Sequence, residues 1–216
     1  MAISGADIGD IKPEEGKSIE FGSKFQNDSI TASAAVFNIN KKNIMRTVDG
    51  VSTPVGEARS RGFEFDFNGR VTQGLSLGAS YAYTKTEVRK DSGAFAVLVG
   101  KPLDATPKHQ ASLLANYDFT HLGLKGFRLG GGARYFGSWF AYSNSGDAYK
   151  MPHAVTYDAF ASYTTKISCY ETNFQLNVKN LTDKIYYTSY NPEGKNILAI
   201  VPGYGRQFML TASVKF

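Results

Sequence analysis

The sequence predicts an all-β fold, an antiparallel up-and-down transmembrane β-barrel, on three observations. Apolar and polar residues alternate with a period of two in most of the chain, and the composition includes 15 Phe, 13 Tyr and 22 Gly in 216 residues. Short and long connections also alternate between the patterned segments. A period of two places one apolar row and one polar row on opposite faces of a strand. In a membrane barrel the apolar row faces lipid and the polar row faces a wet interior.

The first four predicted strands each carry one apolar row. These rows are Ile19, Phe21 and Phe25 in 19–25; Ala35, Phe37 and Ile39 in 34–40; Phe63, Phe65 and Phe67 in 62–69; and Leu75, Leu77, Ala79, Tyr81 and Tyr83 in 75–83. The third strand is the clearest case, because Glu64 and Asp66 separate its phenylalanines.

The other five predicted strands continue the pattern. They span 109–119, 127–137, 155–164, 173–180 and 207–216, and the last has the apolar row Phe208, Leu210, Ala212, Val214 and Phe216. Leu114 interrupts the polar row of the first of these five. In the second, Gly130–Gly132 is not followed by the Lys-Ser/Thr of a phosphate loop, so it indicates strand bending or close packing.

The connections favour a barrel over a sandwich. Short turns such as QND and ISCY alternate with the long segments 43–57, 89–106, 141–153 and 183–203. Greek-key sandwiches have no reason to alternate in this way, whereas outer-membrane barrels have short periplasmic turns and long extracellular loops. We therefore expect the long loops to be extracellular and the C-terminus periplasmic. Aromatic residues near strand ends, namely Phe25, Tyr83, Phe119 and Trp139, are expected in interfacial girdles.

Charge and motifs argue against other classes of function. The net charge of +5 comes from scattered basic residues and not from one stripe, so the sequence does not predict a nucleic-acid partner. No apolar run is long enough for a membrane-spanning helix. The three histidines are far apart, so no metal site is expected. Glu64 and Asp66 could form a catalytic pair of carboxylates. The favoured interpretation is that they are ordinary polar residues of the wall of the lumen. We expect no enzyme activity.

Several blocks together carry a family resemblance. NLTDKIYY (180–187) precedes a Gly205-Arg206 pair that leads into a last strand ending in Phe. Upstream stand KPEEGKSIEFGSKF, RSRGFEFDFNG, TPKHQASLLANYDF, and GGGARYFGSW followed by MPHAVTYDAF. In this order, from about Lys12 onward, the blocks resemble the C-terminal part of TonB-dependent siderophore receptors.

The resemblance implies a fold and a function. Such receptors are 22-stranded barrels with a plugged lumen, so this chain would be a C-terminal fragment of about nine strands. Residues 1–17 would be an extracellular loop remnant and 18–216 barrel, with the plug domain absent. The parent would import ferric siderophores through the outer membrane, driven by TonB acting on the plug. Iron would be carried only as the chelate, with no resident cofactor, and the fragment alone would not be transport-competent.

Two groups of residues are singled out as sites. In this family the alternating last strand resembles the signal read by the outer-membrane insertion machinery, which would use Phe208, Leu210, Val214 and Phe216. Aromatic residues of the long connections could stack on an iron chelate, or could serve only in loop packing or girdles. These candidates for ligand binding are Trp139, Tyr142, Tyr186, Tyr187, Tyr190 and Tyr204.

Two alternative functions remain. A soluble β-sandwich or barrel acting as a binding module would also have strands with one polar face. A lipid-degrading barrel enzyme would need a Ser/His/Asp constellation, and none can be assembled from the sequence.

Overall fold

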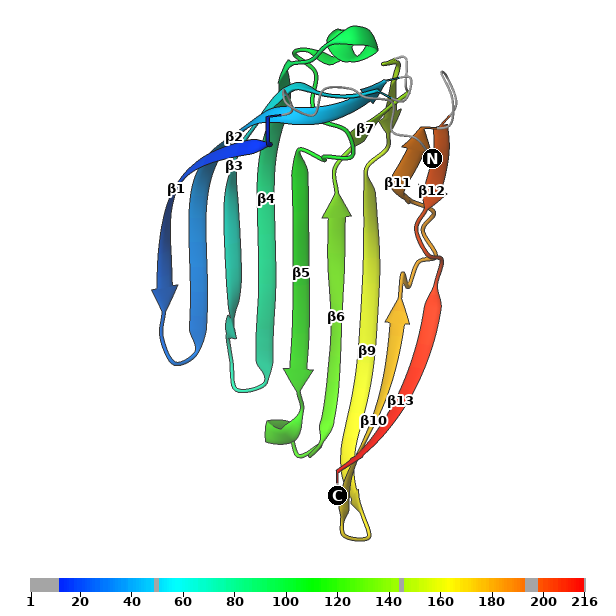
Figure 1. Cartoon of the computed structure of the whole chain (residues 1–216). Coiled ribbons are helices and arrows are strands. Elements are labelled where there is room, and N and C mark those ends of the chain that lie inside the picture. Colours follow the sequence, from blue (N-terminus) through cyan, green and yellow to red (C-terminus); the bar gives the residue numbers. More distant parts are fainter. Residues whose placement is uncertain (1–11, 49–50, 144–145, 193–197, 216) are drawn as a thin grey trace.

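Nine strands form one antiparallel sheet in the order β1-β2-β3-β4-β5-β6-β9-β10-β13 (Figure 1). The computed structural model describes residues 12–48, 51–143, 146–192 and 198–215. The strands are β1 (Glu15–Gln26), β2 (Ile30–Val48), β3 (Val51–Arg70), β4 (Leu75–Lys90), β5 (His109–Asp118), β6 (Phe127–Phe136), β9 (Ala154–Ile167), β10 (Tyr170–Lys179) and β13 (Gln207–Lys215). Each overlaps one predicted strand, which confirms the up-and-down arrangement.

The two ends of the sheet differ as the connections predict. Short turns gather at one end together with the C-terminus, and the long connections gather at the other (Figure 1). The prediction of a long loop at 43–57 is wrong, because β2 and β3 continue to pair through it as far as Val48 and Val51. The other long connections contain structure of their own: the 3₁₀ helix η2 (Gly93–Leu98), the hairpin β7 (Trp139–Tyr142) with β8 (Ala148–Met151), and the hairpin β11 (Tyr187–Pro192) with β12 (Leu198–Pro202). Of the predicted loop remnant 1–17, residues 1–11 lie outside the described residues, and β1 begins within it at Glu15.

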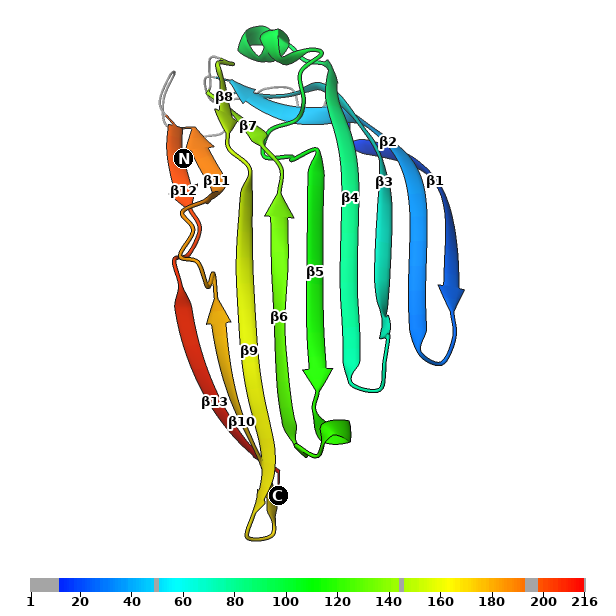
Figure 2. The same ribbon diagram turned by 180° about the vertical axis from the view of Figure 1, so that it is seen from behind.

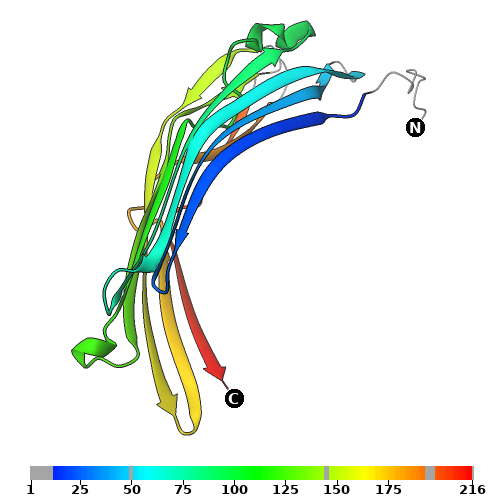
Figure 3. The same cartoon turned by 90° about the vertical axis from the view of Figure 1, so that its left-hand side faces the viewer.

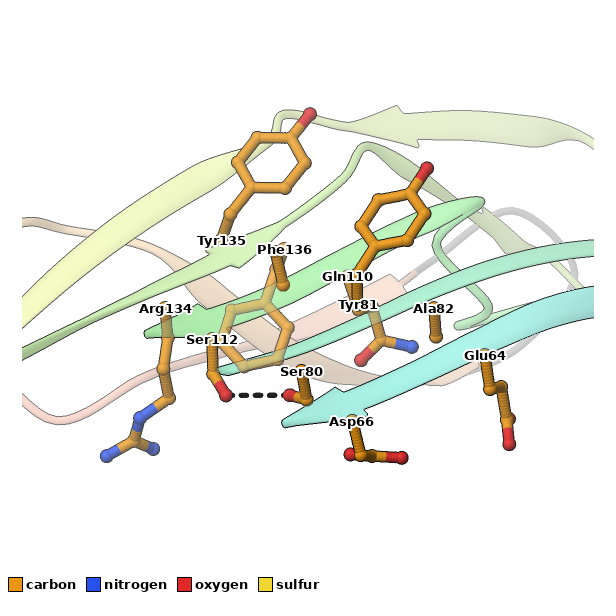
Figure 4. A pocket seen from close by; sticks show the side chains of 11 residues that line it. Glu64, Asp66, Ser80, Tyr81, Ala82, Gln110, Ser112, Arg134, Tyr135 and Phe136 are labelled. Carbon is orange, nitrogen blue, oxygen red and sulfur yellow. Dashed lines mark hydrogen bonds between the residues drawn. The ribbon is translucent and has the colours of Figure 1, made fainter. Parts of the chain in front are cut away.

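The sheet is a curved wall (Figures 2 and 3). Its register places the apolar rows on one face and the polar rows on the other, as with Phe63 opposite Tyr83 and Asp66 opposite Ser80. Figure 4 shows Tyr81 and Tyr135 on one side and Asp66 and Arg134 on the other. On the apolar face Leu113 is 52% exposed even though it lies in an interior strand. The polar face is the more covered side, as expected for the inside of a curve: its Thr86, Thr156 and Ser162 are buried.

No second sheet covers the apolar face within the described ranges. The only other sheets there are the two-stranded hairpins at the long-connection end. A β-sandwich needs two packed sheets, so the described residues do not form one. In the same ranges no helix has the length and apolar character needed to cross a membrane.

One predicted face is wrong, because the apolar row of β2 is the other one. The register pairs Val36 with Phe63, so Val36 lies on the apolar face and Phe37, with its row, lies on the polar face. There the Phe37 ring covers Gly62, where an added Cβ would lie 2.7 Å from Phe37 Cζ. A large ring on the polar face therefore fills the space that a glycine leaves.

The triple glycine allows close packing, as predicted. A Cβ at Gly130 would collide with the ring of Phe160, and one at Gly132 would lie 2.8 Å from the Leu113 carbonyl oxygen. Gly130 is paired with Phe160 across β6 and β9. Again an aromatic ring of the polar face lies over a glycine of the next strand.

Cross-strand polar contacts tie the polar face together. Ser80 Oγ lies 2.7 Å from Ser112 Oγ. Arg134 Nη2 donates to Asp158 Oδ2 at 2.6 Å, joining β6 to β9. Ser80, Ser112 and Arg134 sit on the wall of an open trough of about 390 Å³ that Glu64, Asp66 and Gln110 also line (Figure 4). The polar groups of this trough lie on the face that the sequence predicts to be the lumen.

The sheet ends in two edges that run in the same direction. β1 and β13 each pair with one neighbour only among the described strands, and both point toward the short-turn end (Figure 1). Bringing these edges together would make a parallel pair. Antiparallel closure therefore needs an odd number of further strands between them.

The orientation of the faces predicts the effect of an arginine in β3. Phe65→Arg places a cation on the apolar face and should lower the free energy of unfolding in a lipid bilayer by about 3 kcal/mol. Asp66→Arg introduces the same side chain on the polar face and should cost less than about 1 kcal/mol. Denaturant titration of both variants in bilayers measures the difference. Equal costs would contradict the assigned faces.

Candidate functional site

Three long connections interlock at one end of the sheet, and we call their described residues there the rim: 91–106, 139–143, 146–151, 186–192 and 198–202. Tyr142 Oη donates to the Pro102 carbonyl at 2.9 Å. The Ala105 amide donates to the Phe140 carbonyl at 2.9 Å. The Tyr190 hydroxyl donates to Asp104 Oδ2 at 2.9 Å, across 86 residues of sequence. These bonds hold the η2 connection against both hairpins.

Tyr142 is a packing residue of the rim. It is 6% exposed and forms an apolar cluster with Val88 and Leu98. Its ring stacks on Phe140 at 6.2 Å between centroids. Burial, with the negative charge of Asp104 nearby, raises the pKa of the Tyr142 phenol, so the group stays protonated as a donor. This position fits loop packing, the alternative considered for it, better than direct contact with a ligand.

Trp139 also lies inside the rim. It is 5% exposed, so the expectation that it faces the lipid in a girdle is wrong. Its ring lies 6.0 Å from that of Tyr190. The short β7–β8 hairpin carries Trp139 away from the end of the sheet, where a girdle residue would lie.

Two adjacent pockets open beside these rings. The first, of about 220 Å³, is lined by Trp139, Tyr186 and Tyr187 among others, with Gln110 and Thr188 as polar groups. The second, of about 320 Å³, brings Tyr142 and Tyr190 together with Asp104 and Ser189. Ala105 lines both. Neither lining includes Lys, Arg or His.

The rim therefore unites five of the six predicted ligand residues. Tyr204 is the exception: it is 78% exposed and lines neither pocket. Asp104, Gln110 and Ser189 were missed by sequence reasoning. No local pattern marks them, because each reaches the rim only through the folding of a long connection or the upper end of a strand.

The histidines serve in aromatic contacts and are not assembled into a metal site. His109 Nδ1 lies 2.9 Å from the Tyr81 hydroxyl, and His121 Nε2 lies 3.0 Å from that of Tyr117. His153 is 6.0 Å from the ring of Tyr135. Within the described residues no group of three or more His, Cys, Asp or Glu could hold a metal ion.

A corner around Asn180 follows the end of β10 at Lys179. Asn180 has a left-handed φ of 49° and is 4% exposed. Its Nδ2 donates to the carbonyls of Lys184 (2.9 Å) and Tyr204 (3.1 Å), and its Oδ1 accepts from the Lys184 amide. Its own amide donates to Asp158 Oδ1, whose other oxygen holds Arg134. Through its backbone amide and its side chain, Asn180 thus links β9, the end of β10 and the approach to β13.

The same corner sets the start of the last strand. The Arg206 amide donates to Asp183 Oδ1 at 2.8 Å, immediately before β13 begins. Asp183 also has a left-handed φ, 52°. NLTDKIYY and the later Gly-Arg pair are therefore parts of one hydrogen-bonded turn, which explains why they occur together.

The last strand presents the predicted insertion residues on one face. Phe208, Leu210 and Val214 are 67%, 75% and 46% exposed on the apolar side of the edge strand β13. The Arg206 guanidinium lies 5.9 Å from the Phe208 ring centroid. Phe216 lies outside the described residues. The role of this strand in insertion stays a prediction.

A curved antiparallel wall, polar inside and apolar outside, with short turns at one end and a structured rim at the other, defines the β-barrel class of outer-membrane proteins. Comparison with known families places it more narrowly. Residues 2–181 match the family model described as TonB dependent receptor-like, beta-barrel. The chain belongs to this family.

Relatives and solved structures agree. An uncharacterized TonB-dependent receptor of Haemophilus influenzae is 43% identical over 96% of the chain and 62% of its own length. The ferrichrome outer membrane transporter/phage receptor of Escherichia coli is 32% identical over 98% of the chain and 28% of its own length. The crystal structure of the siderophore receptor PiuA from Acinetobacter baumannii superposes with a TM-score of 0.77 at 27% identity, over 94% of this chain and 28% of that one. The chain thus spans only part of these proteins.

The Asn180 corner predicts a local but costly substitution. Asn180→Ala removes the three hydrogen bonds of a buried side chain and disfavours the left-handed backbone, so it should lower the free energy of unfolding by about 3 kcal/mol. Asn173→Ala is the matched control, because Asn173 donates one side-chain bond, to Thr164, and should cost about 1 kcal/mol. Denaturant midpoints of the two variants compare them. Similar midpoints would show that the corner is not a structural link.

Proposed function

We propose that this chain is part of the barrel of an outer-membrane receptor that imports ferric siderophores. The observation that carries the proposal is the combination of family membership with an aromatic-lined rim at the long-connection end. Relatives named for ferrichrome, for ferrioxamine B and for catecholate siderophores are 30–32% identical to it. Iron enters this scheme as cargo within the chelate, and the barrel supplies no metal ligand.

The rim and the wall have separate parts in the proposed transport. Trp139, Tyr186 and Tyr187 line the smaller pocket, where flat rings can pack on a chelate. Below the rim the polar face offers carboxylate, hydroxyl, amide and guanidinium groups to a hydrophilic solute passing through the lumen. Energy from TonB reaches such receptors through a plug domain. None of the described elements is a plug, so in our proposal the chain does not transport by itself.

The orientation in the membrane forms part of the proposal. We place the rim outside the cell and the short turns, with the C-terminus, in the periplasm, because outer-membrane barrels have long loops outside. The exposed row Phe208, Leu210 and Val214 then ends on the side from which insertion machinery acts. Outer-membrane lipid contacts the apolar face.

Ligand binding can be followed through the single tryptophan. The chain has one Trp, and Trp139 lines the smaller pocket. A ferric siderophore should quench its fluorescence in the micelle-solubilised chain, and the iron-free siderophore should not. Tyr187→Ala should weaken binding about tenfold by removing a stacking ring.

Tyr204→Ala is the control for this titration, because Tyr204 lines neither pocket. It should leave the affinity unchanged. No quenching by any ferric siderophore, or quenching unaffected by Tyr187→Ala, would contradict the assignment of the rim as the binding site.

Orientation can be tested with the single cysteine. Cys169 is exposed in the short turn between β9 and β10. In intact cells that display the chain in the outer membrane, a maleimide too large to cross that membrane should leave Cys169 unlabelled and should label it after permeabilisation. The variant Cys169→Ser with Tyr149→Cys, in the exposed part of β8, should be labelled without permeabilisation. The reverse pattern would invert the orientation.

A further inference from the structure

Two cations face each other on the membrane side of the sheet. Arg61 of β3 and Lys85 of β4 are directly opposite in the register, two residues beyond the pair Phe63 and Tyr83 on the same face. Both side chains are exposed. The row that is apolar across the middle of the sheet therefore ends, toward the rim, in two positive charges.

Neither cation has a partner within the described part of the chain. Arg61 and Lys85 take part in no ion pair or side-chain hydrogen bond there. On its other side Arg61 is opposite the neutral Asn38. Like charges directly opposite in a sheet destabilise it, so this arrangement calls for an anion from outside the chain.

The surroundings increase the positive charge. Arg59 lies on the same face one position further along the row and donates from Nε to Asn38 Oδ1 at 2.7 Å. Glu87, opposite Arg59, is an acidic residue of this row and is paired with Arg89 at 3.0 Å, and Glu57, the next residue of the row in β3, lies opposite Lys90. Neither carboxylate lies opposite Arg61 or Lys85, so these two cations are left to bind something else.

An aromatic belt lies just below the cations. Tyr83 lies 5.1 Å and Tyr81 6.2 Å from the ring of His109, and Phe63 lies 6.5 Å from Tyr81. Such belts lie at the level of the lipid headgroups. Two residues further along a strand is about 7 Å, which places the cations where headgroup phosphates lie.

We propose that Arg61 and Lys85, flanked by Arg59, bind the phosphate of an anionic lipid in the leaflet on the rim side. We call this surface the phosphate site. Arginine offers a planar fork that matches a phosphate, and lysine adds a point charge. The acyl chains of the same lipid can lie along the apolar row below, which a free anion cannot use. This inference needs the apolar face to meet lipid, but it needs no siderophore and no plug.

Lipid binding by the full chain in detergent micelles tests the proposal. Phosphatidic acid should bind more tightly than phosphatidylcholine with the same acyl chains, measured by native mass spectrometry during titration. Arg61→Gln combined with Lys85→Gln should weaken phosphatidic acid binding about thirtyfold, since each cation near an anionic lipid surface contributes a similar amount. Millimolar inorganic phosphate should not displace the lipid.

Two controls separate charge at this site from general effects. Arg70→Gln combined with Lys125→Gln removes the same charge from exposed positions at the short-turn end and should leave lipid affinity unchanged. Arg61→Lys keeps the charge and should retain most of the binding.

Three results would overturn the phosphate site. They are equal affinity for the two lipids, equal losses in the two double variants, and displacement of the lipid by inorganic phosphate, which would indicate a site for free anions. Loss of binding in Arg61→Lys as complete as in the double glutamine variant would also count against a role for charge. Ferric siderophore quenching of Trp139 should be the same in all these variants, so failure here is distinct from failure of the proposed function.

Discussion

A strand within hydrocarbon must pair its backbone amides and carbonyls with neighbouring strands, because lipid offers no partner for them. This constraint accounts for the main features of the wall. Consecutive strands of the wall lie side by side, and the two small hairpins form separate sheets at the rim. Each strand of the wall has one row of side chains on the outer face and one row on the inner face. By the same constraint the outer edges of β1 and β13, which are unpaired among the described strands, are incompatible with lipid. Further strands must cover these two edges. Because β1 and β13 run in the same direction, antiparallel closure requires an odd number of such strands.

The wall and the rim are stabilised in different ways. Along the wall, apolar side chains such as Leu113 stay half-exposed and the inner face is held by polar contacts, as between Arg134 and Asp158. The buried apolar cluster of the described residues, around Val88 and Tyr142, lies at the rim. A rigid pocket needs side chains locked by packing. The rim therefore supplies the rigidity that a site requires, and the wall supplies the passage.

The existence and order of the strands could be predicted, because the alternation of apolar and polar residues along a strand is visible in the sequence, as at Phe63 and Phe65. The face of β2 could not, because both of its rows contain apolar residues and only pairing with β3 distinguishes Val36 from Phe37. Aromatic residues of the long connections were found by composition. Their division into packing residues, such as Tyr142, and pocket residues, such as Tyr187, depends on contacts between segments far apart in sequence. The pattern around Asn180 was recognisable, but its bonds were not.

The bond between Tyr190 and Asp104 has a consequence for assembly. It spans 86 residues, whereas the sheet grows by pairing each strand with a recent neighbour in the chain. Local contacts form early and distant ones late, since closing a long loop has the larger entropic cost. The strands of the wall can thus pair one hairpin at a time while the three rim segments are still apart. The binding site at the rim would form last, and on mild heating it would be lost while the strands of the wall stay paired.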